Sequence, residues 1–438
     1  MGNSKRFSVL RDPVHGDVYL THEELRVLDT PEMQRMRGIK QLGTAYLVYP
    51  GAVHTRFDHS IGTVHMAQKM IEAIRLSFDL DPAGSLSITE DEARVIRIAA
   101  LLHDVAHIPH GHSIEDQDGL FERHDTPYRF KRLFDSARPL GKVLRELDVY
   151  EDVFSILTEP GTEDRREVPA YWAQLIGGTI AADILDYLAR DAYFTGLRLE
   201  VDPRVTSYFK IDRASGNLYI DLAKHALLRE DILSEIVRML EARYYFSERV
   251  YYHHAKVVSG AMIAKAVELA VQDGLTEQDL YPLTDDGLLR MLADSGDDRI
   301  ARLIRNLSQR RLLKRSYTLT TAQVGRRGRD ERIATYNRSI EARQEVEQQI
   351  ADAVVLDPDQ VILYCPDISL IKEAWVLVRT PEGLRRLNEP RDSPPFDVKA
   401  VEDQYERLWR LYIFAPEGYR DRVSSVCARI FNEPSAPI

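Results

Sequence analysis

The stretch ALLHDVAHIPHGH, from Ala100 to His112, places four histidines and one aspartate within ten residues, although the chain of 438 residues has only 13 histidines. Histidine and aspartate side chains that occur together bind divalent metal ions or transfer protons. The stretch therefore predicts a metal site or a proton-transfer site, and its place in the fold decides between them.

Two other segments carry side chains of the same kind. HTRFDHSIG, residues 54–62, carries His59 at the start of a predicted helix, and Asp183 lies in a later predicted helix. Asp183, Tyr187 and Asp191 recur at every fourth position, so they share one face of that helix. The chain thus offers candidate ligands from three separate segments.

Two imidazoles and two carboxylates form the candidate metal site: His59, His103, Asp104 and Asp183. Mixed nitrogen and oxygen ligands suit a borderline or hard divalent ion that keeps positions for water. Such an ion activates water and polarises a phosphoryl oxygen. An isolated His-Asp pair is common, and a buried histidine at a helix end is usually structural. The spacing over three helices favours the metal site, and this H…HD…D order resembles the HD phosphohydrolase superfamily.

The composition is that of an ordinary globular protein, with 44% hydrophobic and 29% charged residues and a net charge of −11. This charge repels nucleic acid and anionic membranes, so an anionic ligand needs a local basic pocket. The two cysteines, Cys365 and Cys427, exclude a disulfide scaffold and fit a reducing cytosol. No apolar run reaches the roughly 18 residues of a spanning helix. We expect a cytoplasmic protein without a membrane segment, for which nucleic acid is an unlikely partner.

The hydrophobic periodicity predicts the elements that must hold these side chains. Helices are expected over residues 59–78, 90–104, 171–196 and 228–272, and a β-hairpin over 207–222. Residues 325–332, GRRGRDER, are expected to form a basic, solvated loop rather than a nucleic-acid site. Strands are expected over 360–366, 373–380 and 408–416, with a closing helix over 419–431. The change of pattern places a boundary near residues 270–290.

Five motifs resemble the SAM-and-HD-domain family of deoxynucleoside triphosphate triphosphohydrolases over about residues 7–265. They are DPVHGDVYL, LDTPEMQRMRGIKQLG, VYPGAVHTRFDHSIG, LLHDVAHIPHGH and DILDYLARDAYFTG. The resemblance implies a mainly α fold: an HD-domain helical core with a small β-hairpin, residues 1–275. A C-terminal α+β subdomain for regulation or oligomerisation, residues 276–438, follows. The resemblance also implies cleavage between the 5′ oxygen and the α-phosphate, which releases deoxynucleoside and triphosphate.

The resemblance implies a role for each matching site residue. One divalent metal ion binds at His59, His103, Asp104 and Asp183, Arg56 contacts the phosphates, and the catalytic group is His107, His112, Glu115 and His124. Tyr187 and Asp191 bind the deoxyribose, Gln41 and Leu42 lie beside sugar and base, and Arg243 binds phosphate. Tyr251 crowds the sugar 2′ position and so excludes ribonucleotides.

Three positions depart from the family pattern. Ile184 stands where the regulated animal members have a lysine on the triphosphate. Glu115 replaces an aspartate, and Tyr252 replaces a glutamine near the base. The metal ligands are complete, whereas a phosphate contact and base contacts have changed, so the preferred base is not predicted.

The family has an activating nucleotide site between subunits, and five residues match it: Asp29, Gln34, Arg37, Arg310 and Lys314. Ser8 stands where a lysine of that site is expected. An alternative interpretation is that DTPEMQRMR, residues 29–37, is a solvated charged helix with Asp29 or Thr30 near its N-cap. The resemblance also implies a homo-oligomer, a dimer or tetramer.

Three functions remain open. The first is hydrolysis of deoxynucleoside triphosphates. The second is a phosphodiesterase or nucleotidase acting on a monophosphate, a cyclic nucleotide or a short oligonucleotide, which Ile184 and Tyr252 favour. The third is a non-catalytic nucleotide-binding regulator, which the complete ligand set disfavours. The metal is one of Mn, Fe, Mg, Ni or Zn, and Mg can accompany the nucleotide.

Overall fold

Helices make up most of the computed structural model, which describes residues 7–117, 119–199, 202–224, 227–367, 376–389 and 396–437. The first ten α-helices are α1 (His22–Leu28), α2 (Pro31–Arg35), α3 (Arg56–Leu80), α4 (Glu90–Leu102), α5 (Gly111–Glu115), α6 (Pro127–Leu133), α7 (Pro139–Glu146), α8 (Tyr150–Leu157), α9 (Ala170–Ile176) and α10 (Ala182–Thr195). The others are α11 (Glu230–Phe246), α12 (His254–Gln272), α13 (Glu277–Leu280), α14 (Asp285–Ala293), α15 (Asp298–Ser308), α16 (Thr321–Arg332), α17 (Ile340–Val354), α18 (Phe396–Glu406) and α19 (Arg420–Ile430). Within the described ranges, no helix is long and apolar enough to cross a membrane.

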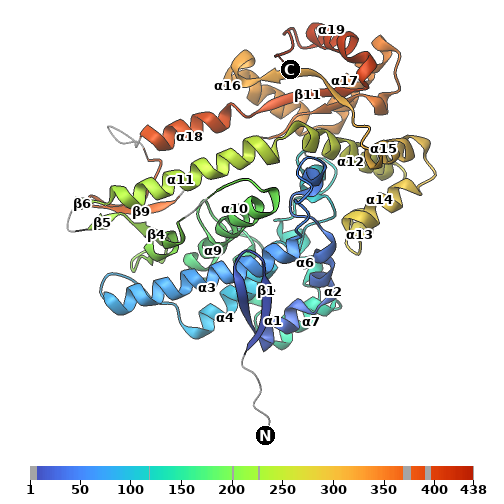
Figure 1. The fold of residues 1–438 in the computed structure, drawn as a ribbon. Coiled ribbons are helices and arrows are strands. Elements are labelled where there is room, and N and C mark those ends of the chain that lie inside the picture. The colour runs from blue at the N-terminus through green and yellow to red at the C-terminus, as the bar shows by residue number, and fades with distance from the viewer. Residues whose placement is uncertain are drawn as a thin grey trace.

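Helix α3 packs against α4 and α10 (Figure 1), and these helices carry the candidate metal ligands. A capping box of Thr55 and Asp58 starts α3, and one of Thr89 and Glu92 starts α4. Each box satisfies backbone N–H groups that a helix start leaves unpaired. The two helices expected over residues 59–78 and 90–104 are therefore confirmed, with their starts fixed by local sequence.

The single helix expected over residues 171–196 is wrong, because two helices, α9 and α10, occupy that segment. Gly177 and Gly178 separate them, and Gly177 has an extended backbone at φ −119° and ψ 131°. Two adjacent glycines weaken a helix interior, at about 1 kcal/mol each relative to alanine. The break matters for function because it puts Asp183 in the first turn of α10. Gly196 ends α10 in the left-handed conformation, at φ 72°.

The helix expected over residues 228–272 is also interrupted. α11 ends in a π-helical turn, Ser247–Tyr251, and α12 begins afresh at His254. π-Helical turns occur often at functional sites because they redirect side chains. This turn carries Tyr251.

Within the described residues, eleven short strands form four sheets. The strands are β1 (Phe7–Asp12), β2 (Gly16–Thr21), β3 (Phe209–Ile211), β4 (Leu218–Asp221), β5 (Ala223–Lys224), β6 (Leu227–Leu228), β7 (Lys314–Thr320), β8 (Ile362–Tyr364), β9 (Leu377–Thr380), β10 (Gly383–Arg386) and β11 (Arg410–Ala415). β1 pairs with β2 and β5 pairs with β6, both antiparallel. The other two sheets have the orders β10-β9-β4-β3 and β7-β11-β8.

The predicted hairpin of residues 207–222 is confirmed as β3 and β4, with Phe209 opposite Ile220. β9, from the C-terminal part of the chain, extends this sheet by parallel pairing of Val378 with Ile220. Part of the expected strand over residues 373–380 lies outside the described residues. Sequence periodicity predicts the individual strands but not the long-range pairing of β9 with β4.

The C-terminal sheet of β7, β11 and β8 lies at one end of the molecule with α16, α17 and α19, opposite the end that carries β1 and α1 (Figure 1). It has its own apolar core, which includes Tyr317, Leu363, Leu411 and Val423. This arrangement confirms a mainly α fold with a helical core and a C-terminal α+β region. The domain division at residue 275 stays a prediction.

The basic loop expected at residues 325–332 is wrong, because these residues form most of α16, which has a kink at Gly325. A capping box of Thr320 and Gln323 starts the helix. Its arginines have acidic neighbours: Arg327 lies 2.9 Å from Glu331, one turn along the helix. Such a pair stabilises an exposed helix. A prediction from the glycine and arginine content alone does not detect this pairing.

Candidate metal centre and active site

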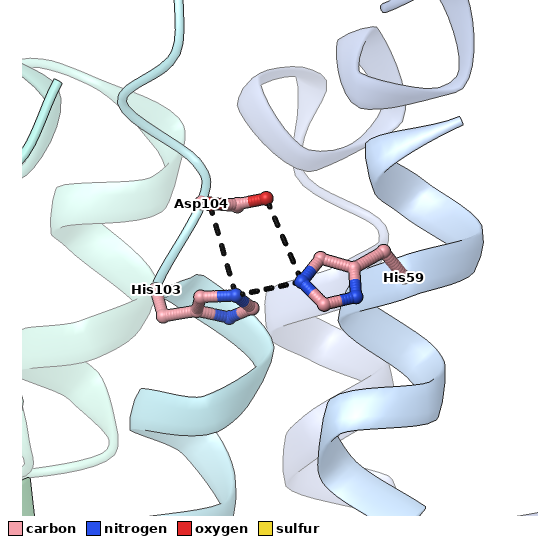
Figure 2. Close-up of side chains that lie close together, drawn as sticks. All are labelled: His59, His103 and Asp104. Carbon is pink, nitrogen blue, oxygen red and sulfur yellow. Dashed lines mark hydrogen bonds and ion pairs between the residues drawn. The ribbon is translucent and has the colours of Figure 1, made fainter. Parts of the chain in front are cut away.

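The candidate metal ligands all lie at helix ends. His59 is in the first turn of α3, His103 and Asp104 directly follow α4, and Asp183 is in the first turn of α10. Figure 2 shows His59, His103 and Asp104 converging from two helices. Because helix ends are fixed by capping and packing, three helices together can hold these four side chains in one place.

The ligand atoms of His59, His103 and Asp104 all lie within 4.8 Å of one another, and Asp183 lies close to both histidines. His59 Nε2 lies 3.1 Å from His103 Nε2 and 3.0 Å from Asp183 Oδ1. Asp104 Oδ2 lies 3.8 Å from His59 Nε2, and Asp104 Oδ1 lies 3.7 Å from His103 Nε2. Two donors at about 2.1 Å from one ion and at right angles are about 3.0 Å apart. The sequence-based group is thus brought together as expected.

The tautomers of the two histidines indicate that a cation fits between them. His103 Nδ1 lies 2.8 Å from the carbonyl oxygen of Ala100, and His59 Nδ1 lies 2.7 Å from the carboxylate of Asp186. Both oxygens are acceptors, so each Nδ1 carries a hydrogen and each Nε2 is left to bind a proton or a metal ion. Two facing lone pairs at 3.1 Å repel each other unless a cation lies between them. The donor set therefore fits a divalent metal ion.

The charges around the group agree with that fit. Burial opposes ionisation of Asp104, yet the charge of Arg56 and the nearby histidines hold the pKa of this carboxyl well below its usual value. Burial lowers the pKa of His59, but hydrogen bonds with Asp183 and Asp186 raise it to about 10. The buried carboxylates thus attract positive charge, which a divalent ion supplies.

A second cluster, of three histidines and one glutamate, borders the metal group. The rings of His107 and His124 stack with centroids 3.6 Å apart, and His112 lies edge-on 4.8 Å from His107. Glu115 Oε2 lies 2.8 Å from His124 Nδ1, and Glu115 Oε1 lies 2.5 Å from Arg129 Nη1. We call His107, His112, Glu115 and His124 the histidine cluster.

The histidine cluster holds its groups in different protonation states. Burial, reinforced by the charge of Arg56, lowers the pKa of His107 and His112 well below the usual value. Burial opposes ionisation of Glu115, but His124 and Arg129 hold its pKa well below the usual value. Two neutral imidazoles therefore lie beside a histidine that is paired with an anionic glutamate. This combination suits proton transfer.

Asp104 connects the two groups, because its Oδ1 lies 3.3 Å from His107 Nε2, while its Oδ2 lies 2.6 Å from Arg56 Nη1. Arg56 Nε, His107 Nδ1 and Gln41 Oε1 are buried and have no hydrogen-bond partner among the described residues. Unpaired buried polar atoms cost free energy unless a ligand or water satisfies them. They mark the side of the metal group where a polar ligand fits.

The candidate sugar residues form a hydrogen-bonded chain. Tyr251 Oη lies 2.6 Å from Asp191 Oδ2, and His54 Nε2 lies 2.8 Å from Asp191 Oδ1. Tyr187 lies between these residues and the metal group, with its ring centroid 6.4 Å from that of His59 and 6.5 Å from that of Tyr251. The shared face of α10 predicted this order. The sequence placed His54 in the same motif as His59 but predicted no role for it at Asp191.

The remaining candidates lie around this chain. Gln41 donates its backbone N–H to the carbonyl oxygen of His54 at 3.0 Å, and Leu42 is buried. The pKa of Arg243 is raised, mainly by Tyr187, so these two side chains are neighbours. Ile184 is only 2% exposed and packs in the main core, where it offers nothing polar to a ligand.

Lys256 of α12 was not singled out from the sequence. Its Nζ donates to the carbonyl oxygen of Tyr251 at 3.2 Å. Burial lowers its pKa, and the neighbouring charges that act on it include Asp116, Arg56 and Asp191. Lys256 therefore adds a second cation near the ligand side of the site. No spacing rule connects it to the motifs, because α12 approaches through tertiary packing.

The five candidate regulatory residues fall into two groups. Gln34 accepts from Arg37 at 3.0 Å, and Arg37 stacks on the ring of Phe57 at 3.5 Å. Arg310 and Lys314 line a cavity of about 260 Å³ that also has Arg315 and Arg420. Within the described residues, no contact joins the two groups. Asp29 is exposed, and Ser8 is on β1. A larger cavity of about 960 Å³ is lined by Pro13, Tyr193 and Arg238, away from the metal ligands.

Comparison with known proteins gives two family matches. Residues 56–161 match the HD domain, and residues 222–436 match the HD-associated region. The solved structure of a phosphohydrolase from Bacteroides thetaiotaomicron is similar, with a TM-score of 0.67 and 20% identity; the match covers 94% of this chain and 100% of that one. This likeness shows a common fold.

Three relatives illustrate the range of similar sequences. An uncharacterized protein of Methanocaldococcus jannaschii is 29% identical over 412 residues, 93% of this chain and 79% of that protein. A deoxynucleoside triphosphate triphosphohydrolase SAMHD1 homolog of Dictyostelium discoideum is 28% identical over 71% of this chain and 60% of its own length. SAMHD1 of Gallus gallus is 28% identical over 60% of this chain and 45% of its own length. The matches thus span about half the length of these two named enzymes.

Proposed function

We propose that this chain, a member of the HD-domain phosphohydrolases, hydrolyses deoxynucleoside triphosphates to deoxynucleoside and inorganic triphosphate. The observation that carries the proposal is the position of Tyr187 between the ligand His59 and the hydrogen-bonded pair of Tyr251 and Asp191. A phosphoester bound at the metal group would extend its sugar towards this pair. The named relatives support the same substrate class.

The metal ligands would be His59, His103, Asp104 and Asp183. When bound, the ion supplies Lewis acidity towards a phosphoryl oxygen and lowers the pKa of coordinated water.

Arg56 and Arg243 would bind the phosphates, because a guanidinium matches phosphate oxygens with paired N–H groups. Arg56 already holds Asp104, and its unpartnered Nε leaves a donor for a ligand. Lys256 is a further cation in reach of this region. It would replace part of the charge that the family places where this chain has Ile184.

His124 would supply the proton for the leaving group. Water attacks the α-phosphorus, the bond between that phosphorus and the 5′ oxygen breaks, and the 5′ oxygen takes the proton. His124 suits this step because its Nδ1 lies 2.8 Å from Glu115, which orients the ring beside His107. Arg129 holds Glu115 in place at 2.5 Å. The neutral His107 and His112 would orient the phosphate beside it.

Product analysis tests the proposal. The protein is incubated with each deoxynucleoside triphosphate and Mn²⁺ or Mg²⁺, and the products are separated by ion-exchange chromatography. We expect deoxynucleoside and triphosphate in equal amounts from the wild type and no products from Asp183→Ala. Nucleoside monophosphate or diphosphate as the first product would contradict the proposed site of cleavage.

The burial of Ile184 favours a second candidate, a nucleotidase or phosphodiesterase for an ester with fewer phosphates. Such an enzyme would use the same metal ligands but need fewer cations along the phosphate chain. The same chromatography with deoxynucleoside monophosphates and cyclic or short oligonucleotides distinguishes it. Turnover of these, with none of triphosphates, would select this alternative, and no turnover of any would select a nucleotide-binding regulator.

A further inference from the structure

A buried carboxylate, Asp186, lies directly behind the proposed metal ligand His59. Asp186 is fully buried and comes from α10, one turn after Asp183. Its Oδ2 lies 2.7 Å from His59 Nδ1, the ring nitrogen that faces away from the metal group. The sequence showed no role for Asp186, although an aspartate four residues before an arginine on an apolar helix face is typical of a buried ion pair.

Asp186 is saturated with hydrogen bonds. Oδ1 accepts from His15 Nε2 at 2.6 Å and from Arg190 Nη2 at 2.9 Å. Oδ2 accepts from His59 Nδ1 at 2.7 Å and from Arg190 Nε at 2.9 Å. A carboxylate has about four lone-pair positions, and donors fill all of them here. Asp186 therefore has no lone pair left for a metal ion, and it differs in this from Asp183.

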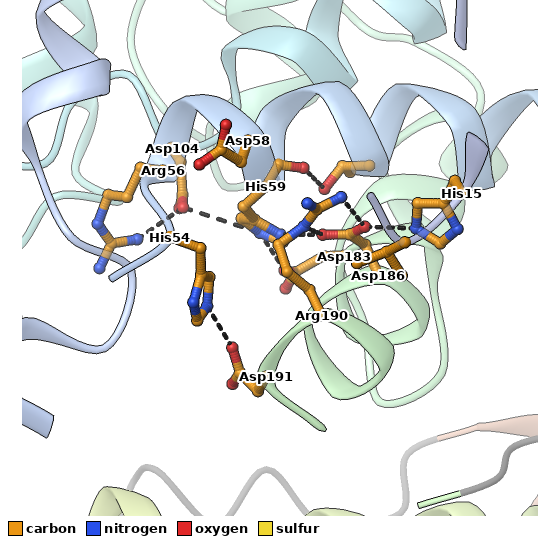
Figure 3. A network of polar contacts seen from close by, with 12 residues as sticks. His15, His54, Arg56, Asp58, His59, Asp104, Asp183, Asp186, Arg190 and Asp191 are labelled. Carbon is orange, nitrogen blue, oxygen red and sulfur yellow. Dashed lines mark hydrogen bonds and ion pairs between the residues drawn. The ribbon is translucent and has the colours of Figure 1, made fainter. Parts of the chain in front are cut away.

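The N-terminal turn between β1 and β2 completes the arrangement. Asp12 Oδ2 accepts from Arg190 Nη1 at 2.8 Å, while Asp12 Oδ1 accepts from the backbone N–H groups of Val14 and His15. His15 also stacks on His65 of α3, with ring centroids 4.9 Å apart. In the turn formed by DPVHG, His15 contacts Asp186 directly and Asp12 contacts it through Arg190 of α10; Figure 3 shows His15 and Arg190 beside Asp186.

Gly62 of α3 leaves room for this contact. A Cβ atom at Gly62 would lie 1.8 Å from Asp186 Oδ1 and 2.3 Å from Arg190 Nη2, so neither side chain could keep its place. Gly62 has no positive φ, and a helix interior disfavours glycine. The close approach of the Asp186–Arg190 ion pair to α3 explains why a glycine occupies position 62.

We propose that Asp186, held by Arg190, Asp12 and His15, is the positioning residue of the metal centre, so that the N-terminal DPVHG turn is part of that centre. Asp186 fixes the hydrogen of His59 on Nδ1 and aims its Nε2 lone pair at the metal. Carboxylates in this place orient the ring and raise the basicity of a ligating histidine. The inference rests on the metal site of the proposed function and adds the residues that set its affinity.

A purely structural ion pair between α10 and α3 is the competing explanation, and metal affinity separates the two. The test uses Asp186→Asn, whose amide nitrogen replaces one acceptor oxygen, so that some of the four donors lose their partner. The matched control is Asp221→Asn, since Asp221 on β4 is also largely buried and accepts from Arg379 and Lys210 at 2.5 and 2.9 Å. Mn²⁺ binding is measured by calorimetric titration, and circular dichroism monitors folding.

We expect Asp186→Asn to weaken Mn²⁺ binding about ten- to a hundredfold and Asp221→Asn to leave it unchanged. The visible absorption of the Co²⁺ form should also change in Asp186→Asn, because it reports the geometry of the ligands. Folded Asp186→Asn protein with the Mn²⁺ affinity of the wild type would overturn the inference. Equal weakening in Asp221→Asn would also overturn it.

His15→Phe and Gly62→Ala keep the inference testable if Asp186→Asn does not fold. His15→Phe removes one of the four donors to Asp186, and we expect a several-fold loss of Mn²⁺ affinity. Gly62→Ala displaces Asp186 without changing any polar group, and we expect a larger loss. Unchanged affinity in a folded His15→Phe protein would then decide against the inference. A wild type that binds no metal at all would instead refute the metal site of the proposed function.

Discussion

At the scale of single residues, hydrogen-bond acceptors decide which side chains can be metal ligands. Ala100 and Asp186 take the Nδ1 hydrogens of His103 and His59, so both Nε2 atoms face the same point. Asp183 keeps one third of its side chain exposed, whereas Asp186 is saturated and fully buried. In the proposed site, identical carboxylates three positions apart on one helix would thus serve as ligand and as support. The motif order alone does not distinguish them.

The discrimination between sugars is a residue-scale prediction. If Tyr251 excludes a 2′-hydroxyl by bulk, Tyr251→Ala should lower the ratio of kcat/KM for dATP over ATP. Exclusion by the shape of a pocket is worth about 1–3 kcal/mol, so we expect a roughly 10- to 200-fold lower ratio. Tyr244→Phe, on the outer part of the same helix, is the control. A wild type that turns over ATP and dATP equally would contradict the role of Tyr251.

The neighbouring contact with the 3′-hydroxyl is a separate prediction. Asp191 holds both His54 and Tyr251, and a substrate hydroxyl would share its oxygens. A buried polar group that loses its partner costs about 1–3 kcal/mol. We expect the 3′-deoxy analogue of dATP to have a kcat/KM roughly 10- to 100-fold lower than dATP, measured by product chromatography. Equal values for the two compounds would remove Asp191 from the sugar site.

At the scale of elements, local sequence predicted the helices that carry the ligands but not their interruptions. The capping boxes of Thr55 and Thr89 and the apolar periodicity were sufficient for α3 and α4. The break between α9 and α10 at Gly177 depends on how far two adjacent glycines lower the stability of a helix. The π-helical turn before Tyr252 has no signal in the local sequence. The candidate site was recoverable from motif order. Lys256 and the pairing of β9 with β4 were not, because both are long-range contacts.

The junction of α12, α17 and β8 contains a buried ionic group that we expect to stabilise the fold. Lys265 Nζ lies 2.7 Å from Glu268 and 2.6 Å from Glu347, and Glu347 accepts the backbone N–H of Leu363 at 2.8 Å. Lys265→Met leaves two buried carboxylates without their cation, at a cost of about 3–5 kcal/mol. Lys131→Met removes the cation of an exposed pair and should change stability little. Urea denaturation measures both, and equal effects would contradict the prediction.

The segment around α5 makes stability depend on pH. Burial lowers the pKa of His110, and burial together with Arg56 lowers that of His112 well below its usual value. The unfolded chain therefore binds more protons than the folded protein below a pH of about 6.5, so stability falls as pH falls. We expect at most about 1.4 kcal/mol per pH unit for each histidine. Denaturation between neutral and mildly acidic pH should show a smaller slope for His110→Gln than for the wild type.

At the scale of the whole molecule, the two regions meet beside the candidate active site. The C-terminal region supplies Tyr364, whose hydroxyl lies 3.0 Å from Asp116, and Asn337, which donates to the backbone carbonyl oxygen of Asp116 at 2.9 Å. Asp116 directly follows α5, which carries His112 and Glu115. The HD domain match and the HD-associated region are therefore connected through the segment that bears the histidine cluster. A ligand or substitution that moves Tyr364 or Asn337 can therefore shift Asp116 and, with it, the neighbouring His112 and Glu115.

An activating nucleotide is the prediction that belongs to this scale. The cavity with Arg310, Lys314, Arg315 and Arg420 is basic, while the chain as a whole carries a net charge of −11. If it joins Asp29, Gln34 and Arg37 of another subunit, GTP or a deoxynucleotide should raise both the rate and the oligomer size, because binding and assembly are linked. Arg310→Ala should remove both effects. A constant rate and constant sedimentation coefficient with added GTP would indicate an enzyme without this activation.

The reaction of dATP in isotope-labelled water, with Mn²⁺ present, tests the central claim most directly. Attack of water on the α-phosphorus places one labelled oxygen in the released triphosphate and none in the deoxyadenosine, which mass spectrometry of both products measures. We predict this pattern for the wild type and no reaction for Asp183→Ala. Labelled oxygen in the deoxyadenosine, or labelled monophosphate or pyrophosphate as a primary product, would contradict hydrolysis at the bond between the α-phosphate and the 5′ oxygen.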